Sequence, residues 1–256
     1  MKKEYIIVAN WKMNKTIDES EIFVNNFNNL LLEIPTSKVI FCPPFLTLFY
    51  MNELLKDSPY GLGAQNLHWE ESGAYTGEIS AAMLTSSGIS HVIIGHSERR
   101  QLFGETDKTV NMKVQKALSS GLTPIMCIGE TLEDRKNNKT LTVLEYQLNN
   151  GLENVAAGDL GKIIFAYEPI WAIGTGERAE PEQIDEAHRT IRNVVDTIGL
   201  EENISILYGG SVKSSNINAL LNINEVNGFL IGGASLDVEE FVSIIHQTEK
   251  HIKKDN

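Results

Sequence analysis

One carboxylate, Glu168, lies where a catalytic base would be expected, at the end of an apolar run over residues 163–167. The run predicts a buried strand. Pro169 cannot donate to a sheet and restricts the preceding residue to extended backbone, so we expect Glu168 to project from a rigid strand end. Gly174 allows a positive φ or a close approach to a ligand. The pattern predicts a base followed by a hinged lid, which comprises Pro169, Ile170, Trp171, Ala172, Ile173, Gly174, Thr175 and Gly176.

This segment also fits two other interpretations. Glu168 alone is equally compatible with an ordinary solvated carboxylate at a turn. Residues 174–179 also fit the G-x-G-x-x-A pattern of a dinucleotide fingerprint, with Asp196 downstream as the acidic residue. That fingerprint needs its first glycine directly after the strand, whereas residues 168–173 intervene here, so we reject it.

Polar residues and glycine pairs that could serve the same site follow other apolar runs. Asn10 and Lys12 follow the first run, His96 follows the fourth, and glycine pairs at 209–210 and 232–233 follow the last two. Each has an ordinary alternative, namely an exposed lysine, a solvated histidine or a simple turn. Parallel strands of a barrel end on one face, so these groups are predicted to converge.

Their chemistry suits a phosphorylated substrate. Glycine turns can direct backbone N–H groups at a phosphate, and a helix beginning after the last strand would add its positive end. Lys12 is a point cation for a phosphate or a developing oxyanion. His96 begins a helix, whose N–H dipoles disfavour an imidazolium, so we expect a neutral hydrogen-bond donor. We expect no metal site, because the other histidines lie at no ligand spacing from cysteines or carboxylates; they are His68, His91, His188, His246 and His251.

The strands that position these groups alternate with amphipathic stretches, a pattern typical of βα units around a parallel sheet. Thr16 and Glu19 form a capping box before one helix, and Pro181 and Gly199 bound another. With no composition break, we expect one domain over residues 1–256, a closed (β/α)8 barrel of the α/β class. The expected strands cover residues 5–9, 38–42, 60–64, 91–94, 123–128, 163–167, 204–208 and 228–231.

Composition limits the partners. The chain has 256 residues and a net charge of -12, which argues against nucleic-acid or anionic-membrane partners because phosphate backbones favour clustered cations. Cys42 and Cys127 lie in apolar runs and are expected to be reduced, structural thiols. The N-terminal residues enter a strand without a signal-type apolar core, and no run is long enough to span a membrane, so we expect a cytoplasmic protein.

Seven segments together resemble the triosephosphate isomerase family. They occur in the family's order along essentially the whole chain, and as a set they are highly specific. The resemblance implies interconversion of dihydroxyacetone phosphate and glyceraldehyde 3-phosphate through an enediol(ate), without a cofactor. There are two departures, Leu102 in place of an aromatic residue and residues 38–41 (KVIF) before the Cys-Pro-Pro, and neither touches an expected role. The segments are 9–14 (ANWKMN), 63–66 (GAQN), 73–78 (GAYTGE), 95–100 (GHSERR), 166–176 (AYEPIWAIGTG), 208–211 (YGGS) and 231–235 (IGGAS).

The resemblance also implies a role for each residue. Glu168 would move the proton between carbons, His96 would polarise the carbonyl group, and Lys12 and Asn10 would hold the substrate and its developing charge. Ser97 and Glu98 would support these catalytic groups. The phosphate would be bound by Gly174, Ser211, Gly232 and Gly233.

Two rival functions stay open at this level. A barrel aldolase or synthase would act on a similar sugar phosphate, but a Schiff-base aldolase needs a lysine in a late strand, where this chain has Glu168. A sugar-phosphate sensor could keep the phosphate-binding turns and lose the base. This chain has Glu168, His96 and Lys12 together, which favours the isomerase.

The long connection over residues 66–78 predicts a homodimer. It places Leu67, Trp69 and Tyr75 on a loop longer than a simple βα turn, where exposed apolar residues need a cover. Packing on the chain's own barrel is the alternative. The resemblance favours a partner, with Thr76 near Asn10 and Glu98 across the interface. The expected interface residues are Gln65, Asn66, Tyr75, Thr76 and Glu78.

Overall fold

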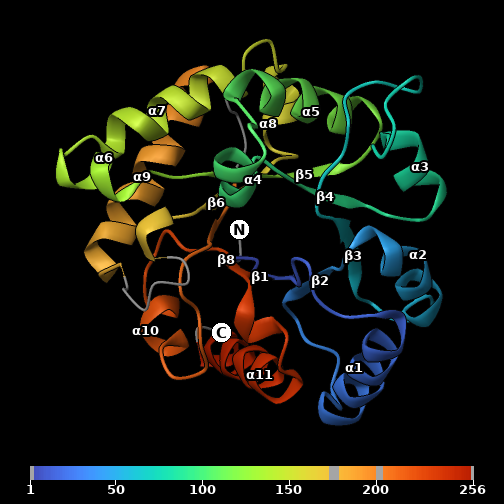
Figure 1. The fold of residues 1–256 in the computed structure, drawn as a ribbon. Coiled ribbons are helices and arrows are strands. Elements are labelled where there is room, and N and C mark those ends of the chain that lie inside the picture. Colours follow the sequence, from blue (N-terminus) through green and yellow to red (C-terminus); the bar gives the residue numbers. More distant parts are fainter. Residues whose placement is uncertain (1–2, 173–178, 200–203, 255–256) are drawn as a thin grey trace.

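The computed structural model describes residues 3–172, 179–199 and 204–254. Eight parallel strands close into a barrel in sequence order, and the helices surround it (Figure 1). The first strand pairs with both the second and the last, so Ile6 lies beside Lys38 on one side and Gly228 on the other. The strands are β1 (Ile6–Asn10), β2 (Lys38–Cys42), β3 (Gly61–Ala64), β4 (His91–Ile94), β5 (Thr123–Ile128), β6 (Ile164–Tyr167), β7 (Ser205–Tyr208) and β8 (Gly228–Ile231).

These strands confirm the expected (β/α)8 barrel, with starts that differ from the expected ones by at most one residue. Helices lie between successive strands along the chain and after the last one. They are α1 (Ile17–Leu30), α2 (Phe45–Leu54), α3 (Ala81–Ser86), α4 (Ser97–Leu102), α5 (Asp107–Ser119), α6 (Leu132–Lys136), α7 (Thr140–Gly151), α8 (Ala157–Leu160), α9 (Pro181–Ile198), α10 (Ile217–Leu221) and α11 (Val238–Lys254), with 3₁₀ turns η1 (Ile170–Ala172) and η2 (Gly233–Ser235).

Alternate strand residues build two cores. Ile6 and Val8 face the barrel interior with their counterparts on the other strands, while Ile7 and Ala9 join the larger core between strands and helices. This alternation is the period-two pattern of a strand. Cys42 and Cys127 belong to the interior core, and both are free and buried, as the sequence predicts.

Local signals fix the helix ends. The Thr16 hydroxyl accepts the Glu19 N–H while the Glu19 carboxylate accepts the Thr16 N–H, which confirms the capping box. Pro181 begins α9, and Gly199 follows its end with φ 120°, a backbone region that favours glycine. None of the described helices is long and apolar enough to cross a membrane.

The connection over residues 66–78 differs from the expectation. Leu67 is fully buried in the main core, and Trp69 is half-buried, so the prediction that both are exposed was wrong. The His68 N–H donates to the Ile79 carbonyl at 2.8 Å, which closes the base of the loop and turns Leu67 inward. Tyr75 is 44% exposed, as expected. Self-burial therefore accounts for the base of the loop but not for its tip.

Candidate active site

Glu168 follows β6 directly and is 2% exposed. Its N–H donates to the Ile128 carbonyl at 2.8 Å, so the backbone continues the strand register at this point. Two neighbouring glycines leave room for it: a Cβ on Gly129 would lie 1.8 Å from the Glu168 carbonyl oxygen, and one on Gly209 would lie 2.9 Å from its Cγ. The barrel rim is therefore built around this residue.

Both carboxylate oxygens of Glu168 are hydrogen-bonded. Oε1 lies 3.0 Å from Nε2 of His96, and Oε2 accepts the Ser97 N–H at 2.8 Å. Burial raises the pKa of Glu168, but the charge and hydrogen bond of His96, the Ser97 N–H and the Lys12 ammonium together hold it below its ordinary value. These contacts favour the ionised form of the carboxylate.

His96 is the N-cap of α4 and is 6% exposed. Its Nδ1 accepts the Glu98 N–H at 3.3 Å, which leaves Nε2 to donate to Glu168. Burial lowers the pKa of His96, but the Glu168 carboxylate raises it above the ordinary value. The expected lowering by helix dipoles is thus wrong for this arrangement, because a carboxylate at hydrogen-bond distance outweighs one N–H dipole.

Lys12 lies two residues beyond Asn10, the last residue of β1, and has a φ of 52°. Its N–H donates to Oδ1 of Asn10 at 3.1 Å, and its carbonyl accepts from Nε2 of Gln65 at 2.8 Å. These two hydrogen bonds stabilise a positive-φ backbone conformation that residues other than glycine rarely adopt. The Lys12 ammonium lies 2.6 Å from Oε1 of Glu98.

These groups open on one small cavity of about 220 Å³. Seven of the predicted catalytic and substrate-binding residues line it: Asn10, Lys12, His96, Glu168, Ser211, Gly232 and Gly233. Ser97 and Glu98 do not line the cavity. Ser97 contacts Glu168, and Glu98 contacts Lys12. The turn after β8 is η2 (Gly233–Ser235), so the expected helix start is a short 3₁₀ turn.

Residue-type reasoning missed Lys213, which also lines the cavity. It follows the Gly-Gly-Ser turn by two residues, and that position was the available signal. It also missed Glu130, which is fully buried and accepts from Tyr167 Oη at 3.1 Å and from Trp171 Nε1 at 2.8 Å. Burial raises the pKa of Glu130 above its ordinary value.

The first part of the predicted lid is described. Pro169 leads into the 3₁₀ turn η1, in which Ile170 is half-buried and Ala172 buried. The Arg135 guanidinium lies over the Trp171 ring, 5.7 Å from its centroid. Nη1 of Arg135 also lies 3.8 Å from Oε1 of Glu130. The remaining lid residues lie outside the described residues; they are Ile173, Gly174, Thr175 and Gly176.

The predicted interface residues divide into two groups. Gln65 also donates to the Cys42 carbonyl at 2.8 Å, and Asn66 accepts from Nζ of Lys113 at 2.7 Å, so both are engaged within their own chain. The loop tip is exposed instead; its predicted members are Tyr75, Thr76 and Glu78.

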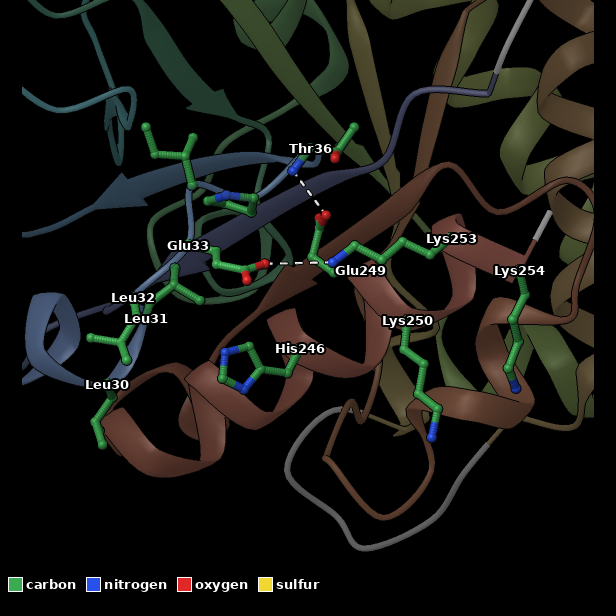
Figure 2. A pocket seen from close by; sticks show the side chains of 12 residues that line it. Leu30, Leu31, Leu32, Glu33, Thr36, His246, Glu249, Lys250, Lys253 and Lys254 are labelled. Carbon is green, nitrogen blue, oxygen red and sulfur yellow. Dashed lines mark hydrogen bonds and ion pairs between the residues drawn. The ribbon is translucent and has the colours of Figure 1, made fainter. Parts of the chain in front are cut away.

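A second, larger hollow of about 720 Å³ lies between residues 30–36 and the end of α11 (Figure 2). None of the predicted site residues lines it. The carboxylate of Glu249, which lines the hollow, accepts the N–H groups of Thr36 and Ser37 at 2.9 and 2.8 Å. The Lys253 ammonium forms an ion pair with Glu33. These are structural contacts that tie α11 to the connection after α1. Among residues 3–172, 179–199 and 204–254, no three histidine, cysteine, aspartate or glutamate side chains are grouped to hold a metal ion.

The fold and the site define a (β/α)8-barrel enzyme in which a buried carboxylate, an imidazole and a lysine surround one small cavity at the carboxyl ends of the strands. The family model described as triosephosphate isomerase matches residues 5–248. The chain belongs to the triosephosphate isomerase family.

Similar proteins agree along the full length. A triosephosphate isomerase of Geobacter metallireducens is 48% identical over 94% of this chain and 97% of its own. Those of Chloroherpeton thalassium and Endomicrobium trichonymphae are 47% and 45% identical, over 97% and 94% of this chain and 100% and 97% of their own.

Proposed function

We propose that the chain interconverts dihydroxyacetone phosphate and D-glyceraldehyde 3-phosphate with Glu168 as the single base that moves the proton. The reaction is that of the family to which the chain belongs. The observation that supports the roles most strongly is the buried contact of 3.0 Å between Glu168 and His96, beside Lys12, in a cavity flanked by glycine turns.

The phosphate is held at the turns after β7 and β8. Gly232, Gly233 and Ser211 line the cavity, and their backbone N–H groups supply donors that cost no side-chain entropy. Gly174, which lies outside the described residues, is assigned a further N–H donor by the same proposal. Binding at this end places the three-carbon skeleton between Lys12 and Glu168.

Proton transfer then follows from the pair of Glu168 and His96. A substrate that enters must replace the hydrogen bonds from His96 and Ser97 to the carboxylate. Their loss in a buried site raises the basicity of Glu168, which accepts a proton from one carbon and returns it to the next. His96 Nε2–H donates to the substrate oxygen, and Lys12 and Asn10 stabilise the negative charge of the enediol(ate).

The lid over residues 169–176 excludes water from this intermediate. At the base of this segment, Nε1 of Trp171 donates to Oε1 of Glu130 at 2.8 Å. Closure exchanges this hydrogen bond for contacts over the cavity, and the apolar residues of the lid desolvate the carboxylate. Glu130 thus fixes the start of the proposed lid to the end of β6, through Trp171 and Tyr167.

The same proposal includes the assembly. The exposed loop tip at Tyr75, Thr76 and Glu78 is the proposed contact surface for a second copy of the chain. Gln65 and Asn66 fix the base of the loop through their hydrogen bonds to Lys12 and Lys113. The whole chain, residues 1–256, acts as one domain and uses no cofactor. The free thiols of Cys42 and Cys127 support a reducing compartment, the cytoplasm.

A coupled assay tests the function. The purified chain is given D-glyceraldehyde 3-phosphate, and the dihydroxyacetone phosphate formed is reduced by a coupling dehydrogenase. We expect continuous turnover without added metal or cofactor and with no release of cleaved products. Cleavage of a larger sugar phosphate, or binding without turnover, would contradict the proposal.

A further inference from the structure

The charges that line the cavity are unequally compensated. The Lys12 ammonium lies 2.6 Å from Glu98, and the Glu168 carboxylate is hydrogen-bonded by His96 and Ser97. Lys213 lines the same cavity and is exposed. Within the described part of the chain its ammonium has no hydrogen bond or ion pair. Among the described residues that line the cavity, it is therefore the positive charge without an ion partner.

The turn that presents Lys213 is fixed on two sides. The Asn216 side chain accepts the Lys213 N–H at 2.8 Å and donates to the Ser211 carbonyl at 2.9 Å. Glu240, from α11, accepts both the N–H and the hydroxyl of Ser214 at 2.7 Å. The backbone at Lys213 is thus held two residues from Ser211, beside the N–H groups proposed to bind the phosphate.

The rest of the molecule repels such a substrate. The chain has a net charge of -12, and triose phosphates enter as dianions. A local cation at the mouth of a cleft focuses the field and raises the encounter rate with an anion despite an unfavourable net charge. Lys12 supplies little of this field, because Glu98 neutralises it at close range.

We infer that Lys213 is the substrate-recruiting residue, the charge that draws the phosphate dianion into the cavity and hands it to the backbone N–H groups of Ser211, Gly232 and Gly233. The inference rests on the proposed function and extends it. Lys213 acts on capture and release of the phosphate and takes no part in proton transfer.

The test compares Lys213→Gln with the parent across ionic strength. We expect kcat/KM to fall about three- to tenfold near ~10 mM salt and by less than about twofold near ~0.5 M, because salt screens the charge. The kcat value should stay unchanged. Lys213→Arg should restore kcat/KM, and Lys213→Glu should lower it further than Lys213→Gln.

Lys250→Gln is the matched control. Lys250 lines the second hollow and extends outward from α11 in Figure 2, in a pocket that shares no residue with the active-site cavity. The substitution changes net charge by the same amount, so an effect of overall charge alone would appear equally in both variants. We expect Lys250→Gln to keep the kcat/KM and salt dependence of the parent.

Two further probes separate phosphate capture from other effects. Inorganic phosphate, used as a competitive inhibitor, should bind more weakly to Lys213→Gln by the same factor as the loss in kcat/KM. D-glyceraldehyde, which lacks the phosphate, should be isomerised equally by Lys213→Gln and the parent.

Three results would overturn the inference while leaving the proposed function intact: equal effects of Lys213→Gln and Lys250→Gln, a loss that is independent of salt, or a fall in kcat with KM unchanged. Failure of the parent chain to isomerise triose phosphates would instead remove the proposed function itself. The parent assay therefore distinguishes the two failures.

Discussion

Among single residues, Glu168 depends on glycines that do no chemistry. The strand end that holds it passes so close to Gly129 that a side chain there would overlap the Glu168 backbone at 1.8 Å. Backbone atoms cannot yield as a flexible side chain can, so the barrel must distort or Glu168 must move.

Gly129→Ala tests this contact. We expect a loss of several kcal/mol of unfolding free energy, or about tenfold or more in kcat if the fold adapts by displacing Glu168, since such overlap is among the costliest substitutions. Urea unfolding and the isomerase assay measure the two outcomes. Gly158→Ala, in α8 with nothing within 4 Å of the new Cβ, is the control and should be neutral or slightly stabilising. Equal behaviour of the two variants would contradict the close approach.

At the scale of the elements, the turn η1 joins β6 to the proposed lid. Trp171 is held by a hydrogen bond of 2.8 Å to the buried Glu130, which also binds Tyr167 at the end of β6. One carboxylate therefore connects the strand that ends at the base with the segment proposed to close over it. Lid movement must break this contact.

The indole of Trp171 should report that step. Binding of a phosphate-bearing enediolate analogue is expected to shift tryptophan fluorescence, because the indole leaves a buried carboxylate for a new environment. The difference signal between the parent and Trp171→Phe isolates this residue from Trp11 and Trp69. If the two proteins give the same titration signal, the lid base does not move.

Helix α9 contains a buried histidine, His188, that makes the folding stability depend on pH. His188 is fully buried against Tyr167, with Nδ1 at 3.2 Å from the Glu225 carbonyl, and burial lowers its pKa to about 3. The unfolded chain has an ordinary histidine pKa of about 6.5, so it binds a proton that the folded chain does not. Folding stability is therefore full above about pH 6.5 and falls as the pH drops below it.

Comparison of His188→Gln with the parent measures this contribution. Between pH 7 and pH 5 the parent should lose about 2 kcal/mol of unfolding free energy to this residue, following about 1.4 kcal/mol per pH unit. His188→Gln cannot take up the proton, so its urea midpoint should fall less over that range. Parallel curves for the two proteins would show that His188 is not buried neutral.

Across the whole molecule, catalysis is proposed to depend on a second copy. The exposed loop tip includes Tyr75 and Thr76, while its base is locked to the barrel by buried Leu67 and by Gln65, which also bonds the Lys12 carbonyl. A contact at the tip would thus be connected to Lys12, the proposed catalytic lysine, through the base of the loop and Gln65.

Thr76→Arg tests the dependence. An unpaired guanidinium in an interface costs several kcal/mol, so sedimentation should show monomer and activity should fall in parallel. Thr197→Arg, on the exposed side of α9, adds the same charge away from the loop and should remain dimeric and active. A fully active Thr76→Arg monomer would break the link between assembly and catalysis.

The sequence predicts the barrel and most of the cavity because both depend on local signals. Apolar runs, caps and strand-end residues specify where Glu168, His96 and Lys12 lie, and a parallel barrel brings strand ends together. Four features depend on contacts that the linear sequence does not show. The pKa of His96 is raised by a carboxylate 72 positions later in the chain, Leu67 is buried by the closure of its own loop, and Glu130 and Lys213 acquire meaning only beside their neighbours in space.

The central claim is that Glu168 moves the proton, and the kcat of Glu168→Gln, with isomerisation in D₂O beside it, tests it most directly. For the parent, we predict product that contains solvent deuterium at the carbon that receives the proton, because a carboxyl proton exchanges with water. Glu168→Gln keeps the shape of the side chain but cannot act as a base, so kcat should fall by about 10²- to 10⁴-fold or more while inorganic phosphate still binds. Because Glu168 can also return the original proton while water is excluded, the deuterium content alone does not decide the question, and a Glu168→Gln kcat within about tenfold of the parent is the result that would contradict the account.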